Sequence, residues 1–172
     1  MMKIFFLPKL AAILVMMQFT TIIRAQSISD TTAIQNILRE EIVSWNNGDA
    51  ETYSKHFATD GTFTNILGIF FTGYKEFLVR HEQIFKGVFK GTALRQNIVS
   101  LKFVRQNVAV VETLTWISGF SKDGPPKGTY LDEKGRLRTR LLQVMVRNSD
   151  GWKIVVYHNV DIKPGVPVPE PH

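Results

Sequence analysis

The chain has 172 residues, of which 44% are hydrophobic and 21% charged, a composition typical of one globular domain. It contains no cysteine, which excludes disulfide bonds, thiol nucleophiles and thiolate metal sites. The formal net charge is +6, but the basic residues are scattered among acids and form no stripe with interleaved exposed aromatics. The composition therefore predicts no nucleic-acid partner.

Residues 1–25 have the features of a cleaved signal peptide: an early lysine, an apolar core over residues 10–17 and a small residue, Ala25, at the end. The alternative is a retained membrane anchor, because the apolar run from Ile4 to Ile23 is nearly long enough to span a bilayer. Pro8 interrupts that run. We expect cleavage after Ala25, a periplasmic or secreted location and no membrane contact afterwards.

Three helices are predicted before the main run of strands. The first is amphipathic and ends at Trp45, just before an Asn47-Gly48 terminator. Asp49 caps a short second helix. The third is predicted from about Tyr74 to Val88, and its apolar face carries Phe77, His81, Ile84, Phe85 and Val88.

The remaining periodicity predicts strands. A period of two begins at Thr62, and longer runs rich in β-branched and aromatic residues follow. The predicted strands are Thr62–Leu67, Ile69–Thr72, Leu94–Val104, Val108–Phe120, Leu137–Arg147 and Trp152–Val160. This order predicts an α+β, cone-shaped fold in residues 26–161. Its strongly bent antiparallel sheet has a concave face covered by the three helices. Residues 162–172 are rich in proline and are predicted to be extended and largely disordered.

The segment WNNGDAETYSKHFATDGTFTN, Trp45 to Asn65, resembles the nuclear-transport-factor-2-like superfamily. That superfamily carries a W-N-x-G-D turn, a short helix and a D-G turn into the first strand. The match is closest to the SnoaL-like and SgcJ/EcaC groups, which also show an asparagine at Asn65 and the pair His158-Asn159. The resemblance implies the cone fold with an internal ligand cavity. It does not imply one reaction, because the superfamily includes isomerases, cyclases, dehydratases and binding modules.

The ketosteroid isomerases of this superfamily use a tyrosine in the first helix, an aspartate base in the first strand and an aspartic acid in a later strand. Alignment on Gly48-Asp49 places Glu41 at the tyrosine and Asn65 at the base, and residues 137–147 contain no acid. Since an amide cannot abstract a proton, the resemblance predicts that this mechanism does not operate here.

Two other side chains are candidates for proton transfer. His81 shares an apolar helix face with Phe77, so it is either a proton acceptor in a cavity or a core histidine bonded to backbone. Glu112 alternates with Val110 and Leu114. If that strand face is concave, the carboxyl is desolvated and suits general acid–base catalysis; otherwise it is an interfacial charge.

Other positions are predicted to bind the ligand or orient it. Asn65 is the candidate orienting amide, and His158 is predicted to reach the interior, with Asn159 pointing away. The predicted ligand-binding set is Trp45, Tyr53, Phe63, Trp116 and His158, although aromatics at this spacing are also typical of plain core. The four histidines lack metal-site spacing, and no phosphate loop or nucleophile elbow is present. We expect no metal and no cofactor.

The sequence therefore predicts an exported domain that binds a small, mostly apolar molecule. It would perform a cofactor-free acid–base step with His81, Glu112 and Asn65. The alternative is a non-catalytic binding or oligomerisation module. Under either reading we expect a homodimer through the outer face of the sheet, predicted to carry Thr113 and Thr115.

Overall fold

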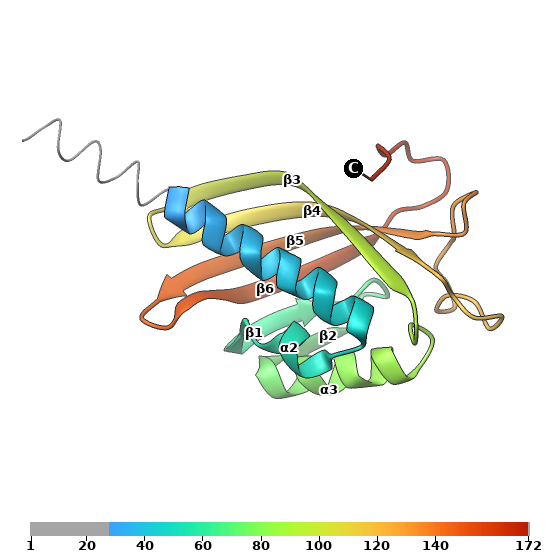
Figure 1. The fold of residues 1–172 in the computed structure, drawn as a ribbon, viewed down its shortest axis with the longest axis horizontal. Coiled ribbons are helices and arrows are strands. Elements are labelled where there is room, and N and C mark those ends of the chain that lie inside the picture. The colour runs from blue at the N-terminus through green and yellow to red at the C-terminus, as the bar shows by residue number, and fades with distance from the viewer. Residues whose placement is uncertain (1–27, 172) are drawn as a thin grey trace, which may run out of the picture. The chain divides into compact units, whose positions relative to one another are not determined.

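The computed structural model describes residues 28–171 (Figure 1), so the predicted signal peptide, residues 1–25, lies outside the described chain. The chain divides into two units after Gln35. Residues 28–35 are helical, and the α+β domain is formed by residues 36–171. No helix in the described part is long and apolar enough to cross a membrane.

The helices begin and end close to the residues predicted from the sequence. Residues 36–47 are helical and end at Gly48, which adopts a positive φ of 67° that glycine tolerates without strain. Asp49 then caps α2, Ala50–Ser54, by accepting a hydrogen bond from the Thr52 N–H at 3.0 Å. The third predicted helix is α3, Gly73–Lys86.

One curved, unclosed sheet of six strands packs against these helices (Figure 1). The strands lie in the order β2-β1-β6-β5-β4-β3. Their bounds are β1 Phe57–Thr64, β2 Phe70–Thr72, β3 Ala93–Arg105, β4 Val108–Ser118, β5 Leu137–Asn148 and β6 Gly151–Asp161. The α+β class with helices on one face of a bent sheet is confirmed.

Two details differ from the prediction. The sheet is mixed, because β1 runs parallel to β6 while the other pairs are antiparallel. Such a pair joins segments far apart in sequence, and no local pattern encodes it. Phe57 starts β1 and does not end the second helix; the register shifts between Phe57 and Thr62, a bulge that hides the period of two.

The helices cover the inner face of the sheet. On β4 this face carries Val111 and Thr113, which are both 0% exposed. The first helix is bound to it at its C-terminal end, where the Trp45 indole N–H donates to Thr92 Oγ1 at 3.1 Å. Asn46 continues the attachment, since its Oδ1 accepts from the Leu94 N–H at 2.7 Å.

An aromatic cluster packs α3 against the strands. Phe77 is 0% exposed, and its ring stacks on Phe57 with a centroid separation of 3.9 Å and an interplanar angle of 6°. The rings of Phe63, His81 and Tyr157 surround it at 5.2, 4.2 and 5.4 Å. The apolar stripe of α3 is thereby fixed against β1 and β6.

The outer face of the sheet carries a smaller core. Leu114, Trp116 and Ile162 are buried together, and Val168 from the tail packs on them. Residues 162–171 contain no helix or strand, yet they contact this outer face. The predicted dimer face must be corrected, because Thr113 and Thr115 lie on the inner face; the homodimer itself stays a prediction.

Candidate functional site

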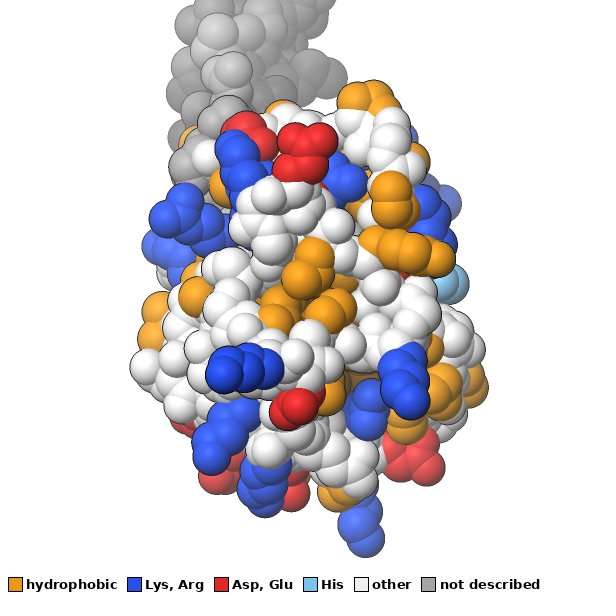
Figure 2. Space-filling view, turned by 90° about the vertical axis from the view of Figure 1, so that its right-hand side faces the viewer, with side chains coloured by type: hydrophobic (Ala, Val, Ile, Leu, Met, Phe, Trp, Pro, Cys, Tyr) orange, Lys and Arg blue, Asp and Glu red, His pale blue; other side chains and the backbone are white. Residues whose placement is uncertain are grey.

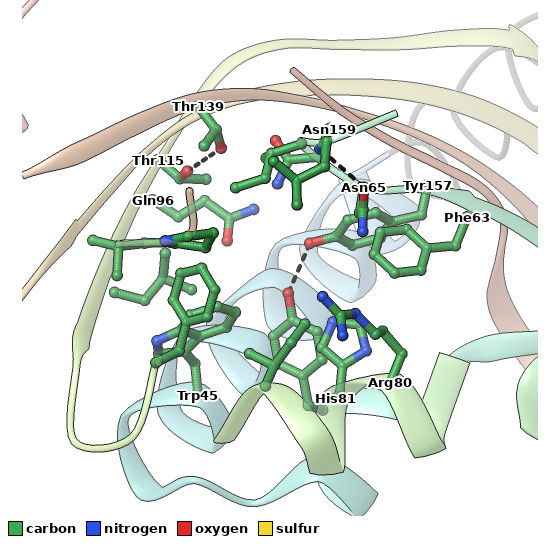
Figure 3. A pocket seen from close by; sticks show the side chains of 18 residues that line it. Trp45, Phe63, Asn65, Arg80, His81, Gln96, Thr115, Thr139, Tyr157 and Asn159 are labelled. Carbon is green, nitrogen blue, oxygen red and sulfur yellow. Dashed lines mark hydrogen bonds between the residues drawn. The ribbon is translucent and has the colours of Figure 1, made fainter. Parts of the chain in front are cut away.

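A cavity of about 60 Å³ lies between the helices and the inner face of the sheet (Figure 3). One side is aromatic and comes from the helices and β1, and the other is polar and comes from β3 to β6. The lining residues are Trp45, Tyr53, Phe63, Asn65, Ile66, Leu67, Arg80, His81, Ile84, Phe89, Leu94, Gln96, Thr115, Ile117, Pro126, Thr139, Tyr157 and Asn159. A small ligand group can therefore meet apolar rings and hydrogen-bonding atoms at once.

His81 is held in one tautomer. Its side chain is 2% exposed, and Nδ1 lies 2.8 Å from the Phe77 carbonyl oxygen. A carbonyl only accepts, so Nδ1 carries the proton and Nε2 is left with a lone pair. Burial lowers the pKa of His81 to about 4, partly opposed by that hydrogen bond, and the Arg80 charge lowers it further. At neutral pH the ring is a neutral acceptor.

Asn65 shapes the rim of the cavity. Its Oδ1 accepts hydrogen bonds from the Leu67 and Ile69 N–H groups at 2.9 and 3.0 Å. These two donors settle which side-chain atom is oxygen, so Nδ2 points the other way. Figure 3 shows the amide of Asn65 directed toward the cavity. Nδ2 is the donor that this orientation turns toward the cavity.

The sheet side of the cavity supplies further polar atoms. The Thr115 and Thr139 hydroxyls lie 2.6 Å apart, and the Gln96 amide donates to Thr113 Oγ1 at 3.2 Å. Asn159 Oδ1 is buried and has no partner within the described chain. Because an unmatched buried acceptor is costly, this atom favours a donor from a bound molecule or water.

A pair of phenols closes the inner end of the aromatic side. The hydroxyls of Tyr53 and Tyr157 lie 2.8 Å apart and are buried. Burial raises the pKa of both groups above the ordinary value, so both stay protonated. The Tyr53 ring lies 4.6 Å from the His81 ring, centroid to centroid. The histidine therefore sits in a buried aromatic environment.

Behind these rings lies a buried carboxyl. Glu41 is 2% exposed, and Gln143 Nε2 donates to its Oε1 at 2.7 Å. Burial raises the pKa of Glu41 to about 8, although hydrogen bonds from Gln143 and Gln96 favour the charged form. Glu41 does not line the cavity, but Gln96 does and links the two. The carboxyl is thus largely protonated at pH 7.

The structure places Glu112 on the opposite face of the sheet from the cavity. Its partner there is Arg140, at 2.5 Å from Nη1 to Oε1, and both side chains are partly exposed. The sequence left open which face carries Glu112; the structure gives the outer one, so the catalytic assignment of Glu112 is wrong. The reason is that both faces of β4 are covered, so both alternating sets contain apolar residues; the inner set includes Thr115 and Ile117.

Trp116 and His158 are also misplaced by the sequence reasoning. Trp116 is buried in the outer-face core, and His158 is exposed. On β6 it is Tyr157 and Asn159 that line the cavity. The remaining predicted residues, Trp45, Tyr53, Phe63, Asn65 and His81, all line it.

Several residues of the site were missed by sequence reasoning. Arg80 precedes His81 on α3, and Gln96, Thr139, Tyr157 and Asn159 come from the strands. A detectable signal existed for Glu41, which shares a helix face with Leu38 and Trp45 at spacings of three and four. An acid on an apolar helix face is a candidate buried carboxyl.

The site contains a neutral base, His81, and an amide donor, Asn65, among largely buried side chains. Such a set can bind a polar group and move a proton without other help. Within residues 28–171 no group of three or more His, Cys, Asp or Glu side chains is placed to hold a metal ion.

The model of the SnoaL-like domain matches residues 34–159, which is most of the chain. The chain belongs to the SnoaL-like domain family. No curated protein matches it. The chain resembles many solved structures, and three illustrate the range.

The first is a domain of unknown function with a cystatin-like fold from Nostoc punctiforme PCC 73102, 23% identical, with 80% of each chain covered and a TM-score of 0.66. The second is a ketosteroid isomerase-like protein from Erwinia carotovora atroseptica, 12% identical, with 77% of this chain and 96% of that chain covered and a TM-score of 0.59. The third is a type 2 hexachlorocyclohexane dehydrochlorinase, 13% identical, with 83% of this chain and 99% of that chain covered and a TM-score of 0.64. At these identities the likeness establishes the shared fold of the SnoaL-like domain.

Proposed function

We propose that this SnoaL-like domain binds a small, mostly apolar molecule in the cavity and catalyses a cofactor-free proton transfer on it. The observation that carries the proposal is the fixed tautomer of His81, whose Nε2 lone pair borders the cavity. Similar folds in an isomerase-like protein and a dehydrochlorinase support the same class of chemistry.

The proposed step starts with His81 Nε2 accepting a proton from a carbon next to a ligand carbonyl. The electron pair of that C–H bond moves onto the carbonyl oxygen, and Asn65 Nδ2 donates a hydrogen bond to the resulting enolate. Return of the proton from the imidazolium to the same or another carbon completes an exchange or an isomerisation. No oxidant or cofactor enters this balance.

One observation favours the second candidate, a non-catalytic binding module. Pockets for drug-sized ligands usually enclose about 300–1,000 Å³, whereas this cavity measures about 60 Å³. It accepts a few atoms of a ligand unless the rim moves. Leu67 on that rim is 44% exposed and is the side chain that can most easily move aside to enlarge the cavity.

Proton transfer is tested by incubating the protein with a panel of small aromatic and alicyclic ketones in D₂O. We expect wild type to exchange the hydrogen next to the carbonyl of at least one ketone, followed by proton NMR. His81→Phe keeps a ring in the cluster and removes the base, so exchange should fall by about 100-fold or more.

The matched control is His158→Phe, because His158 is exposed on the outside and its loss should leave the exchange rate unchanged. Binding is followed in parallel by thermal shift. Ketones that bind wild type without exchange would establish the binding module, and equal exchange in His81→Phe would remove His81 as the base.

We also propose export, supported by the residue pattern of the N-terminus. Expression of the full chain in a bacterium should yield a mature protein that begins at Gln26, outside the cytoplasm. Mass spectrometry of the N-terminus checks this. Recovery of Met1 in the membrane fraction would instead establish a retained anchor.

A further inference from the structure

The charge of the cavity lining comes from one side chain. Arg80 is the single formally charged group among the described lining residues, because burial keeps His81 neutral. Within residues 28–171 no acidic side chain lines the cavity. The cavity therefore presents a positive potential to whatever enters, with no carboxylate to offset it.

The Arg80 guanidinium makes few hydrogen bonds within the described chain. Its Nε is buried and has no hydrogen-bond partner in the described chain. Nη1 donates to Gln83 Oε1 only at 3.4 Å, and the guanidinium lies 6.0 Å from the Phe71 ring. Among the described residues no carboxylate is paired with Arg80. The residue as a whole is partly exposed, but a buried N–H without an acceptor is unfavourable unless a bound group supplies one.

Arg80, from α3, and Asn65, just after β1, line the same cavity, and Figure 3 draws both side chains on the same side of it. The Asn65 Oδ1 is held by the Leu67 and Ile69 N–H groups, which turns the Nδ2 donor the other way. Two donors of this kind, one charged and planar, match the two oxygens of a carboxylate, which arginine binds through parallel N–H groups.

We propose that the ligand of this cavity is a small organic acid whose carboxylate is bound by Arg80 and Asn65. The assignment rests on the proposed function, since it names the class of molecule that the same cavity binds. The apolar body of the acid lies against the aromatic side and brings a C–H group to His81 Nε2, whose lone pair would repel a carboxylate oxygen. One N–H of the Asn65 amide binds the carboxylate with Arg80, and the other remains for the enolate oxygen. Asn159 Oδ1 is left to accept from a hydroxyl of the ligand.

The alternative is an uncharged ligand that does not contact Arg80, so that the guanidinium interacts only with water. It accounts less well for the buried Nε, because water does not reach that N–H and no acceptor in the described chain is bonded to it. It also leaves unexplained why the only formal charge of the described lining adjoins its only base.

The test uses matched pairs of an acid and its amide, which differ in charge but little in shape: benzoate and benzamide, phenylacetate and phenylacetamide, cyclohexanecarboxylate and its amide. Affinity is measured by calorimetry at pH 7, and the site of binding by the ¹⁵N-NMR signals of the Asn65 side-chain amide. We expect at least one acid to bind wild type about 10-fold or more tightly than its amide and to shift those signals.

Arg80→Met keeps the apolar stem and should abolish the preference for the acid while leaving amide binding intact. The matched control is Lys86→Met, which removes the same charge from an exposed position on α3 and should preserve the preference. Arg80→Lys keeps the charge without the planar fork and should give an intermediate ratio.

Amides that bind wild type as tightly as the acids, or a preference that survives in Arg80→Met, would overturn the assignment. If no acid and no amide binds while neutral ketones do, the acid assignment fails and the proposed function stands. If no compound of either panel binds, both fail.

Discussion

Replacing Phe77 with alanine is expected to lower the free energy of unfolding by about 3–5 kcal/mol. The ring is 0% exposed and stacks on Phe57 at 3.9 Å. It also supports the ring of His81 at 4.2 Å. Its removal leaves a void that rigid aromatic neighbours cannot fill, so both the transfer term and the cavity term apply. Urea denaturation followed by circular dichroism measures the loss.

Phe70→Ala is the matched control. Phe70 is 62% exposed on β2, so its truncation should change the free energy of unfolding by about 0.5 kcal/mol or less. Phe77→Leu should fall between the two variants. A loss below about 1 kcal/mol in Phe77→Ala would mean that the cluster is loosely packed, and the fixed position of His81 would then lose its support.

The second large effect is a pH dependence caused by Glu41. The pKa of Glu41 is raised to about 8 by burial, so between pH 4.5 and 8 the folded state holds a proton that the unfolded state has released. Its stabilising contribution is complete below pH 4.5 and is lost as pH rises through 8. His81, with its pKa lowered to about 4, acts in the opposite sense between pH 4 and 6.5.

The two groups offset each other from about pH 4.5 to 6.5, and Glu41 acts alone above that range. We expect the stability of wild type to fall between pH 6.5 and 8 by about 1.4 kcal/mol per pH unit, about 2 kcal/mol in all. Glu41→Gln retains the acceptor for Gln143 and removes the titration, so its stability should stay level over the same window.

Urea denaturation at pH 6.5, 7.25 and 8 checks this dependence, with Glu51→Gln as the control because Glu51 is exposed. The control should fall with pH as wild type does. A wild type that is equally stable at pH 6.5 and 8 would mean that Glu41 is ionised in the folded state or that the helix opens to water.

The sequence predicted the elements well because their signals are local. Gly48 marks the end of one helix and Asp49 the start of the next. The apolar residues of α3 recur at helical spacing along one face. The parallel pairing of β1 with β6 left no local trace. It arises from the tertiary arrangement of the whole sheet, which a short stretch of sequence does not reveal.

The candidate site was predicted where one face of an element is plainly apolar. His81 and Asn65 were found in this way. Glu112 and His158 were misplaced because β4 and β6 are covered or crowded on both faces, so alternation does not say which face is inner. Arg80 was missed because a basic residue on a helix is usually solvated, and only its orphaned Nε distinguishes it.

The parallel pairing of β1 and β6 also constrains how the domain folds. Phe63 pairs in register with Tyr157, so the helices and β1 gain their central strand only after nearly the whole domain has left the ribosome. Contacts of such long sequence separation slow folding. Until then β1 has only the short pairing with β2, and a chain in that condition is still accessible to a chaperone.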